Sequence, residues 1–159
     1  MMTENRQLLE AYTQHASEGA FRELLARYLD LVYSAALRLM EGDLHRAQDV
    51  TQTVFADLAR MAHTLPADVM LGGWLHRHTC FVAAHLLRSE RRRQFRERQA
   101  VEMNPLQIQA ETNLDAVKPL LDEAINELGE PDRTAILLRF FEQRDFRAVG
   151  AALGSTEDA

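Results

Sequence analysis

Apolar side chains recur every three or four residues over a long stretch of this chain, and that period decides its fold class. One series runs from Phe21 to Leu39 and a second from Leu44 to Met61. The members are Phe21, Leu24, Leu25, Tyr28, Leu31, Val32, Ala35, Ala36, Leu39, Leu44, Ala47, Val50, Val54, Leu58 and Met61. This spacing places them on one side of a helix that is buried along that side. The pattern predicts two long amphipathic helices, the second capped by Asp43.

The composition favours an all-α fold. The chain has 159 residues, of which 47% are apolar, with only seven Gly and four Pro. Its long stretches of Ala, Leu, Arg, Glu and Gln hold the residues that lose least side-chain freedom in a helix. A chain of this length can form one medium domain or two small ones.

Interruptions of the period divide the chain. Residues 64–73, with Pro66 and a Gly pair, predict a loop long enough to be functional. A third long helix is expected from about Trp74 to beyond Arg96, with Leu75, Thr79, Val82, Leu86 and Leu87 facing inward. Residues 99–114 have weak periodicity and contain Asn104-Pro105, which is typical of a linker. We therefore expect a first domain at residues 1–98 and a second at 115–159.

The second domain shows the order of a helix-turn-helix. Helices are expected at about 115–128, 131–142 and 145–153, with Gly129 and Pro131 separating the first two. Gly154 then turns the chain, and Ser155 with Asp158 resembles the cap of a new helix. The sequence stops at Ala159, so we expect the motif to be incomplete and to lack most of its recognition helix.

The charge is unevenly distributed. The net charge is −6, yet residues 74–98 hold seven Arg and two Glu. Guanidinium groups pair well with phosphate oxygens, so this basic helix predicts a contact with nucleic-acid backbone. The alternative is a solvated face that is balanced by acidic neighbours.

Aromatic rings recur along the same helix. Trp74, His78, Phe81 and His85 are spaced by four, three and four residues and could form a stripe on which bases stack. The alternative, which we favour from spacing, places Trp74 and Phe81 largely in the core, with His78 and His85 at its boundary.

Several function classes find no support. The single cysteine, Cys80, excludes an internal disulfide, and the N-terminus lacks the blocks of a secretory signal, so a cytoplasmic protein is expected. No apolar run approaches the roughly 20 residues that span a membrane.

His76 and Cys80 are one helical turn apart, but no second ligand pair at zinc spacing accompanies them. We expect no metal, no cofactor and no catalytic residue, since no phosphate loop or nucleophile motif is found.

Four segments resemble, in order and spacing, the extracytoplasmic-function sigma factors, a bacterial class of the sigma-70 family. Residues 28–38 (YLDLVYSAALR) resemble their region 2.1, and residues 47–55 (AQDVTQTVF) resemble region 2.2. Residues 73–93, which begin with GWLHR and end with RRR, resemble regions 2.3 and 2.4. Residues 128–154, which begin with LGEPDR, resemble region 4 up to its turn.

The resemblance implies a transcription initiation factor and not an enzyme. The first domain would bind the β′ clamp helices of RNA polymerase core and capture the melted −10 promoter strand, and an anti-sigma factor is a further candidate partner. The polar side of the helix at 44–61 would contact polymerase through Asp49, Gln52, Thr53 and Asp57. Without the resemblance, the same residues are interpreted as a solvent face. The expected DNA-binding residues are Trp74, Arg77, Arg88, Arg91, Arg92 and Arg93.

The chain departs from the family pattern at three positions and in its last helix. Phe81 and His85 stand where members often have Asn and Asp, so we assign base contacts to neither. Thr53 stands where Glu is common. The incomplete recognition helix removes the expected −35 contacts. Two other classes remain open: a helix-turn-helix regulator of duplex operators, and a helical interaction module whose basic helix binds an acidic partner.

Overall fold

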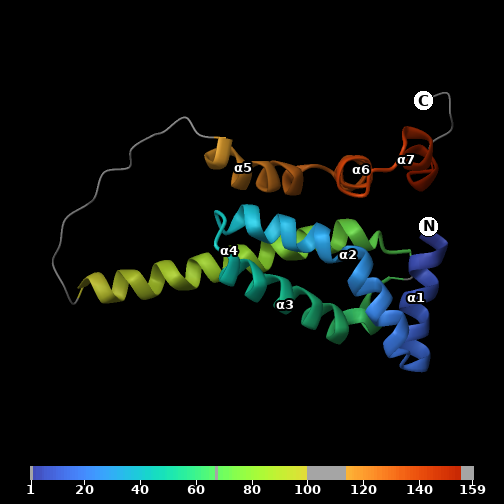
Figure 1. The fold of residues 1–159 in the computed structure, drawn as a ribbon, viewed down its shortest axis with the longest axis horizontal. Coiled ribbons are helices and arrows are strands. Elements are labelled where there is room, and N and C mark those ends of the chain that lie inside the picture. The colour runs from blue at the N-terminus through green and yellow to red at the C-terminus, as the bar shows by residue number, and fades with distance from the viewer. Residues whose placement is uncertain (1, 67, 100–113, 155–159) are drawn as a thin grey trace.

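The structure, a computed structural model, describes residues 2–66, 68–99 and 114–154. These residues form helices and no strand, which confirms the all-α fold (Figure 1). The elements are α1 (Met2–His15), α2 (Glu18–Leu39), α3 (Leu44–Met61), the short 3-10 helix η1 (Ala62–Thr64), α4 (Leu71–Gln99), α5 (Leu114–Glu127), α6 (Glu130–Ile136), the π-helical turn η2 (Leu137–Phe141) and α7 (Phe146–Ala152). Among these described helices, none has both the length and the apolar character needed to cross a bilayer.

Helices α2 and α3 begin where side chains cap them. The Ser17 hydroxyl accepts a hydrogen bond from the Ala20 amide, and the Asp43 carboxylate accepts one from the Arg46 amide. Each cap satisfies an amide that has no partner within the helix. The apolar side of α2 then packs against α1, α3 and α4, so the predicted stripes meet in one core. Its fully buried members include Leu24, Val32 and Leu58.

Helix α4 begins three residues earlier than the sequence suggested. Gly72 and Gly73 were expected in a loop, but they lie in the first turn of the helix. A Cβ atom at Gly72 would lie 3.0 Å from Glu142 Oε1, and one at Gly73 would lie 3.5 Å from Thr134 Oγ1. The Gly pair therefore lets the C-terminal helices approach α4 closely, and the expected loop at 64–73 is shorter because η1 and α4 extend into it.

The C-terminal helices lie along the face formed by α2 and α4. Helix α5 contacts both of them, and α6 and η2 contact α4. Figure 1 shows α5, α6 and α7 following one another beside α2 and α4, with α3 on the other side of the molecule. The main core is built from buried residues between Leu9 and Ala83, with Phe141 packed against its edge. The N-terminal helices thus have a core of their own, onto which residues 114–154 are packed.

The expected linker and cap fall largely outside the described residues. Residues 100–113 and 155–159 belong to that part of the chain, which includes Ser155 and Asp158. The three expected C-terminal helices correspond to α5, to α6 with η2, and to α7. A wider π turn at Leu137–Phe141 was not anticipated; such turns often mark functional positions or close contacts.

Candidate nucleic-acid and polymerase interface

The expected DNA-binding arginines all lie on exposed parts of α4. The exposed residues are Arg77, Arg88, Arg91, Arg92 and Arg93. From Arg91 onward every described side chain of α4 is exposed, and Figure 1 shows this end of the helix projecting beyond α2 and α3. Arg93 pairs with Glu97 at 3.1 Å on the helix surface, a contact that water screens strongly. This end of α4 can therefore present guanidinium groups to a phosphate backbone.

Three aromatic rings form a ladder on α4. The Trp74 and His78 rings stack with centroids 4.8 Å apart and an angle of 10° between their planes. The His78 and Phe81 rings follow at 5.9 Å and 25°. Phe81 is 60% exposed, so the expectation that it belongs to the core is wrong. Its position on α4 turns it away from the stripe of Leu75, Thr79 and Val82, which does face the core as predicted.

The ladder is held in place from α3. Asp57 accepts a hydrogen bond from His78 Nε2 at 2.8 Å, and it also pairs with Arg60. The hydrogen bond from His78 is the main reason that the pKa of Asp57 lies below its ordinary value. Since the Asp57 side chain is only 16% exposed, it is less available to a partner than its position on the polar face suggested. It positions the central ring of the ladder.

The remaining polar residues of α3 do share a surface. Asp49, Gln52 and Thr53 are exposed and line a shallow open groove along α3, together with Ala56, Ala59 and Arg60. The Thr53 hydroxyl donates to the Asp49 carbonyl at 2.8 Å within the helix, so Thr53 offers a partner less than its neighbours do. Helices α5 to α7 do not cover this groove, because they pack on α2 and α4.

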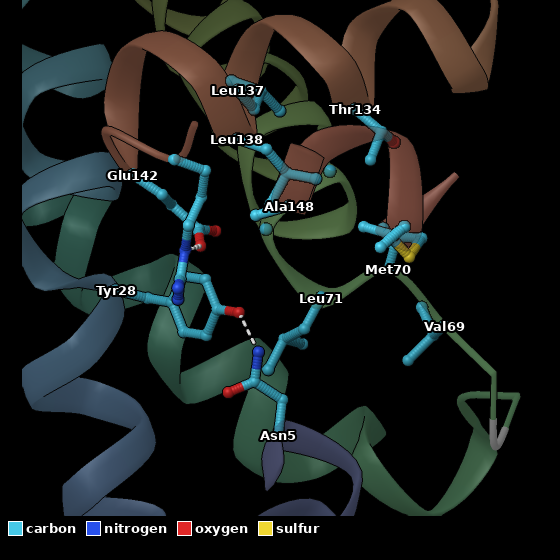
Figure 2. Close-up of a pocket in the computed structure, with 15 residues that line it drawn as sticks. Asn5, Tyr28, Val69, Met70, Leu71, Thr134, Leu137, Leu138, Glu142 and Ala148 are labelled. Carbon is cyan, nitrogen blue, oxygen red and sulfur yellow. Dashed lines mark hydrogen bonds and ion pairs between the residues drawn. The ribbon is translucent and has the colours of Figure 1, made fainter. Parts of the chain in front are cut away.

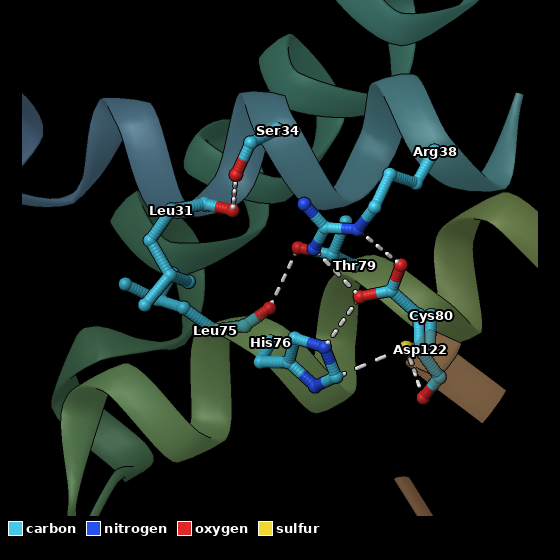
Figure 3. A network of polar contacts seen from close by, with 8 residues as sticks. All are labelled: Leu31, Ser34, Arg38, Leu75, His76, Thr79, Cys80 and Asp122. Atoms are coloured by element: carbon cyan, nitrogen blue, oxygen red, sulfur yellow. Dashed lines mark hydrogen bonds and ion pairs between the residues drawn. The ribbon is translucent and has the colours of Figure 1, made fainter. Parts of the chain in front are cut away.

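A buried charge network that the sequence did not reveal joins α2, α4 and α5. Asp122 of α5 is fully buried and accepts two hydrogen bonds from Arg38, at 2.7 and 2.8 Å, and one from His76 at 2.9 Å (Figure 3). Burial pushes the pKa of Asp122 upward, but the hydrogen bonds from His76 and Arg38 outweigh it and hold the pKa below its ordinary value. Asp122 is therefore a carboxylate that is neutralised by groups from the N-terminal helices.

Neighbouring side chains shield the Asp122 end of the network from water, while Arg38 stays partly exposed. Phe141 of η2 lies with its ring centroid 4.9 Å from the Arg38 guanidinium carbon and 6.3 Å from the His76 ring. Cys80, one turn beyond His76, directs its sulfur at the Asp122 carbonyl oxygen at 3.8 Å. Burial, with the nearby Asp122 charge, raises the pKa of the Cys80 thiol to about 12, which keeps it protonated. The face shared by His76 and Cys80 thus receives α5, and within the described residues no cluster of three potential ligands suits a metal.

The spacing of His76 and Cys80 was the only sequence signal for this network. That spacing indicated that His76 and Cys80 share a face of the helix. It could not indicate which residue packs against that face, because Asp122 is 46 residues from His76 and 84 from Arg38. Within α5, Asp122 is buried one turn from Ile125 while its neighbours Leu120 and Leu121 are exposed. The hydrophobicity of these residues alone would have predicted the opposite orientation, with Leu120 and Leu121 buried and Asp122 exposed.

Comparison with known proteins assigns the N-terminal helices. Residues 24–93 match the family described as Sigma-70 region 2, a segment that runs from within α2 to the basic part of α4. No curated protein matches the chain in sequence. The matched segment contains the ladder, the α3 groove and all of the expected DNA-binding arginines. Residues 24–93 therefore carry a sigma-70 region 2 domain, which supports a sigma-factor role in transcription initiation.

Proposed function

We propose that the chain is a sigma factor of the extracytoplasmic-function type, in which the N-terminal helices bind polymerase core and capture the melted −10 strand. The observation that carries this proposal is the Trp74–His78–Phe81 ladder, which ends in the exposed ring of Phe81 beside the arginines of α4, within a region 2 domain. Aromatic rings stack on unpaired bases of any sequence, and guanidinium groups follow the backbone.

Melting follows from a difference in affinity. A base in a duplex has both faces stacked and cannot lie on Phe81, whereas an unpaired base can. The ladder and the basic end of α4 therefore bind the open strand more tightly than the duplex. Such binding shifts the closed-to-open equilibrium only by the ratio of the two affinities, and no chemical step is required.

The polymerase contact is proposed for the groove of α3, through Asp49 and Gln52. These side chains are exposed, carry acceptors for basic groups of a partner, and lie on the helix that the C-terminal segment leaves uncovered. Residues 115–154 are proposed as the beginning of region 4. Their helices have the predicted order, and Gly154, the expected turn, has a φ of +69°. The expected cap of the recognition helix, from Ser155 onward, lies outside the described residues.

Binding to polymerase core tests the proposal directly. The chain, labelled with a fluorophore, is titrated with core enzyme and followed by anisotropy, beside the variant Asp49→Ala with Gln52→Ala. The matched control is Gln14→Ala with Glu18→Ala, which removes two exposed polar groups near the junction of α1 and α2. We expect tight binding by wild type and control and weaker binding by the α3 variant. Equal binding by all three refutes the α3 contact.

The arginine contacts are tested by salt dependence. Arg91→Ala with Arg92→Ala removes two phosphate contacts, so binding should weaken for every sequence and the slope of log K against log salt should fall by about 2. An unchanged slope refutes the assignment. A chain that ignores core enzyme but prefers a duplex operator is a helix-turn-helix regulator, and one that binds neither is a helical interaction module.

A further inference from the structure

A cavity of about 360 Å³ lies between the region 2 domain and the C-terminal helices (Figure 2). One wall is formed by Tyr28 and by the start of α4 with the residues before it, and the other by α6, η2 and α7. The volume lies within the range of small-molecule sites, which are often found between domains. Nothing in the proposed contacts with polymerase or DNA uses this cavity.

The lining is mostly apolar. Val69, Met70 and Leu71 face Leu138 and Ala148 across the space in Figure 2. Such a lining binds water poorly, because a water molecule needs two to four polar partners to be held in a cavity. An apolar molecule of matching size is a better occupant of this part of the site.

Three polar groups converge on the same space. Asn5 Oδ1 accepts a hydrogen bond from Arg27, so its amide nitrogen donates to the Tyr28 hydroxyl. The Tyr28 proton is then available to a ligand. The Thr134 hydroxyl is buried and has no hydrogen-bond partner among the described residues. A buried hydroxyl without a partner is costly, so a group that pairs with it would be stabilising.

Glu142 supplies the charge of the site. Its carboxylate lies 3.8 Å from Arg144 Nε, and the absence of a side chain at Gly72 leaves room for it. Burial raises the pKa of Glu142, although Arg144 and Arg27 partly offset this. Arg144 and Arg27 balance the charge of the Glu142 carboxylate, so a ligand charged with either sign gains no unpaired partner there. A neutral group that both donates and accepts, such as a hydroxyl, suits Glu142, Tyr28 and Thr134 together.

We propose that this cavity binds a small, neutral, largely apolar molecule with a hydroxyl head, and that the bound molecule holds the C-terminal helices against the region 2 domain. The second part follows because the walls come from both parts of the chain. A ligand that contacts both walls binds the packed arrangement and not the separated one, so it shifts the equilibrium toward packing.

The binding test uses N-phenylnaphthylamine, an uncharged apolar dye that fluoresces in apolar surroundings. The full chain is titrated with the dye, which is then displaced with phenylbutanol or phenylbutyrate, two molecules that share a body and differ in the head. We expect saturable dye binding and displacement by the alcohol at a concentration at least about tenfold lower than by the carboxylate. No saturable binding, or equal displacement by both, overturns the proposal.

Two variants locate the binding. Ala148→Leu fills the cavity and should abolish dye binding, while Ala84→Leu makes the same change on an exposed part of α4 and should preserve it. Glu142→Gln should remove the preference for the alcohol over the carboxylate, whereas Glu123→Gln on the exposed side of α5 should retain it. Dye binding that survives Ala148→Leu places the dye elsewhere and overturns the site. If Ala148→Leu does not fold, the Glu142 comparison decides alone.

The effect on packing is measured by amide hydrogen exchange with and without phenylbutanol. We expect slower exchange in residues 134–152 and little change in α3. Equal exchange in both conditions overturns the coupling. None of these readouts involves polymerase or DNA, so they succeed or fail independently of the sigma-factor proposal.

Discussion

Replacing Asp122 by Ala should release the C-terminal helices while the region 2 domain stays folded. The substitution leaves Arg38 and His76 without their carboxylate in a buried place. Removing one partner of a buried ion pair costs about 3–5 kcal/mol. The Arg38 side chain is 18% exposed and can regain some hydration, so we expect the lower end, about 3 kcal/mol. That is roughly a 150-fold shift of the packing equilibrium.

The loss should be local because the core of the N-terminal helices contains no buried residue from 114–154. Hydrogen exchange read by mass spectrometry separates the two outcomes. Peptides from α5 and η2 should lose protection, as should the faces of α2 and α4 beneath them, while α3 keeps its protection. Glu123→Gln, which changes an exposed charge beside Asp122, is the control and should exchange like wild type.

Two results would refute this reasoning. If α5 in Asp122→Ala stays as protected as in wild type, the network does not hold the segment. If α3 loses protection together with α5, the two parts fold as one unit and the N-terminal core is not independent.

Three further outcomes are expected. Because the pKa of Asp122 is held below its ordinary value, its carboxylate stabilises the packing fully above about pH 4 and the stabilisation is lost as the pH falls further; an acid titration of α5 amide shifts by NMR that shows no release contradicts this. Phe81→Ala removes an exposed ring, so it should weaken binding of unpaired DNA at least about fivefold in an anisotropy assay and leave duplex binding unchanged. Leu58→Ala opens a cavity at a fully buried site and should lower the free energy of unfolding by about 2–5 kcal/mol in urea, a loss that an exposed substitution such as Ala84→Leu should not produce.

Local signals in the sequence were sufficient for the helices. The apolar period, the cap at Asp43 and the break at Gly129 and Pro131 act between residues a few positions apart. A short stretch of sequence is therefore enough to predict their effect. The basic end of α4 was predictable for the same reason, since no other described helix packs against it and its side chains stay exposed.

The candidate site was predictable only in part. The arginines and the polar face of α3 lie where the period placed them, exposed on their helices. Phe81 was assigned to the wrong side, because a single aromatic residue at a boundary position fits either face of the period. Asp57 had a partner, His78, that lies 21 residues away on another helix.

The amino-acid sequence by itself determined the all-α fold, the positions of most helices and the basic helix, because each depends on contacts within one or two helical turns. Tertiary structure alone decided that residues 114–154 pack on α2 and α4, that the Gly72-Gly73 pair serves close packing and not a turn, and that a cavity forms between the two parts. The contacts between the two parts include those of Asp122 with Arg38 and His76. A buried charge is tolerated only where its partners converge, and that convergence is a property of the packed helices.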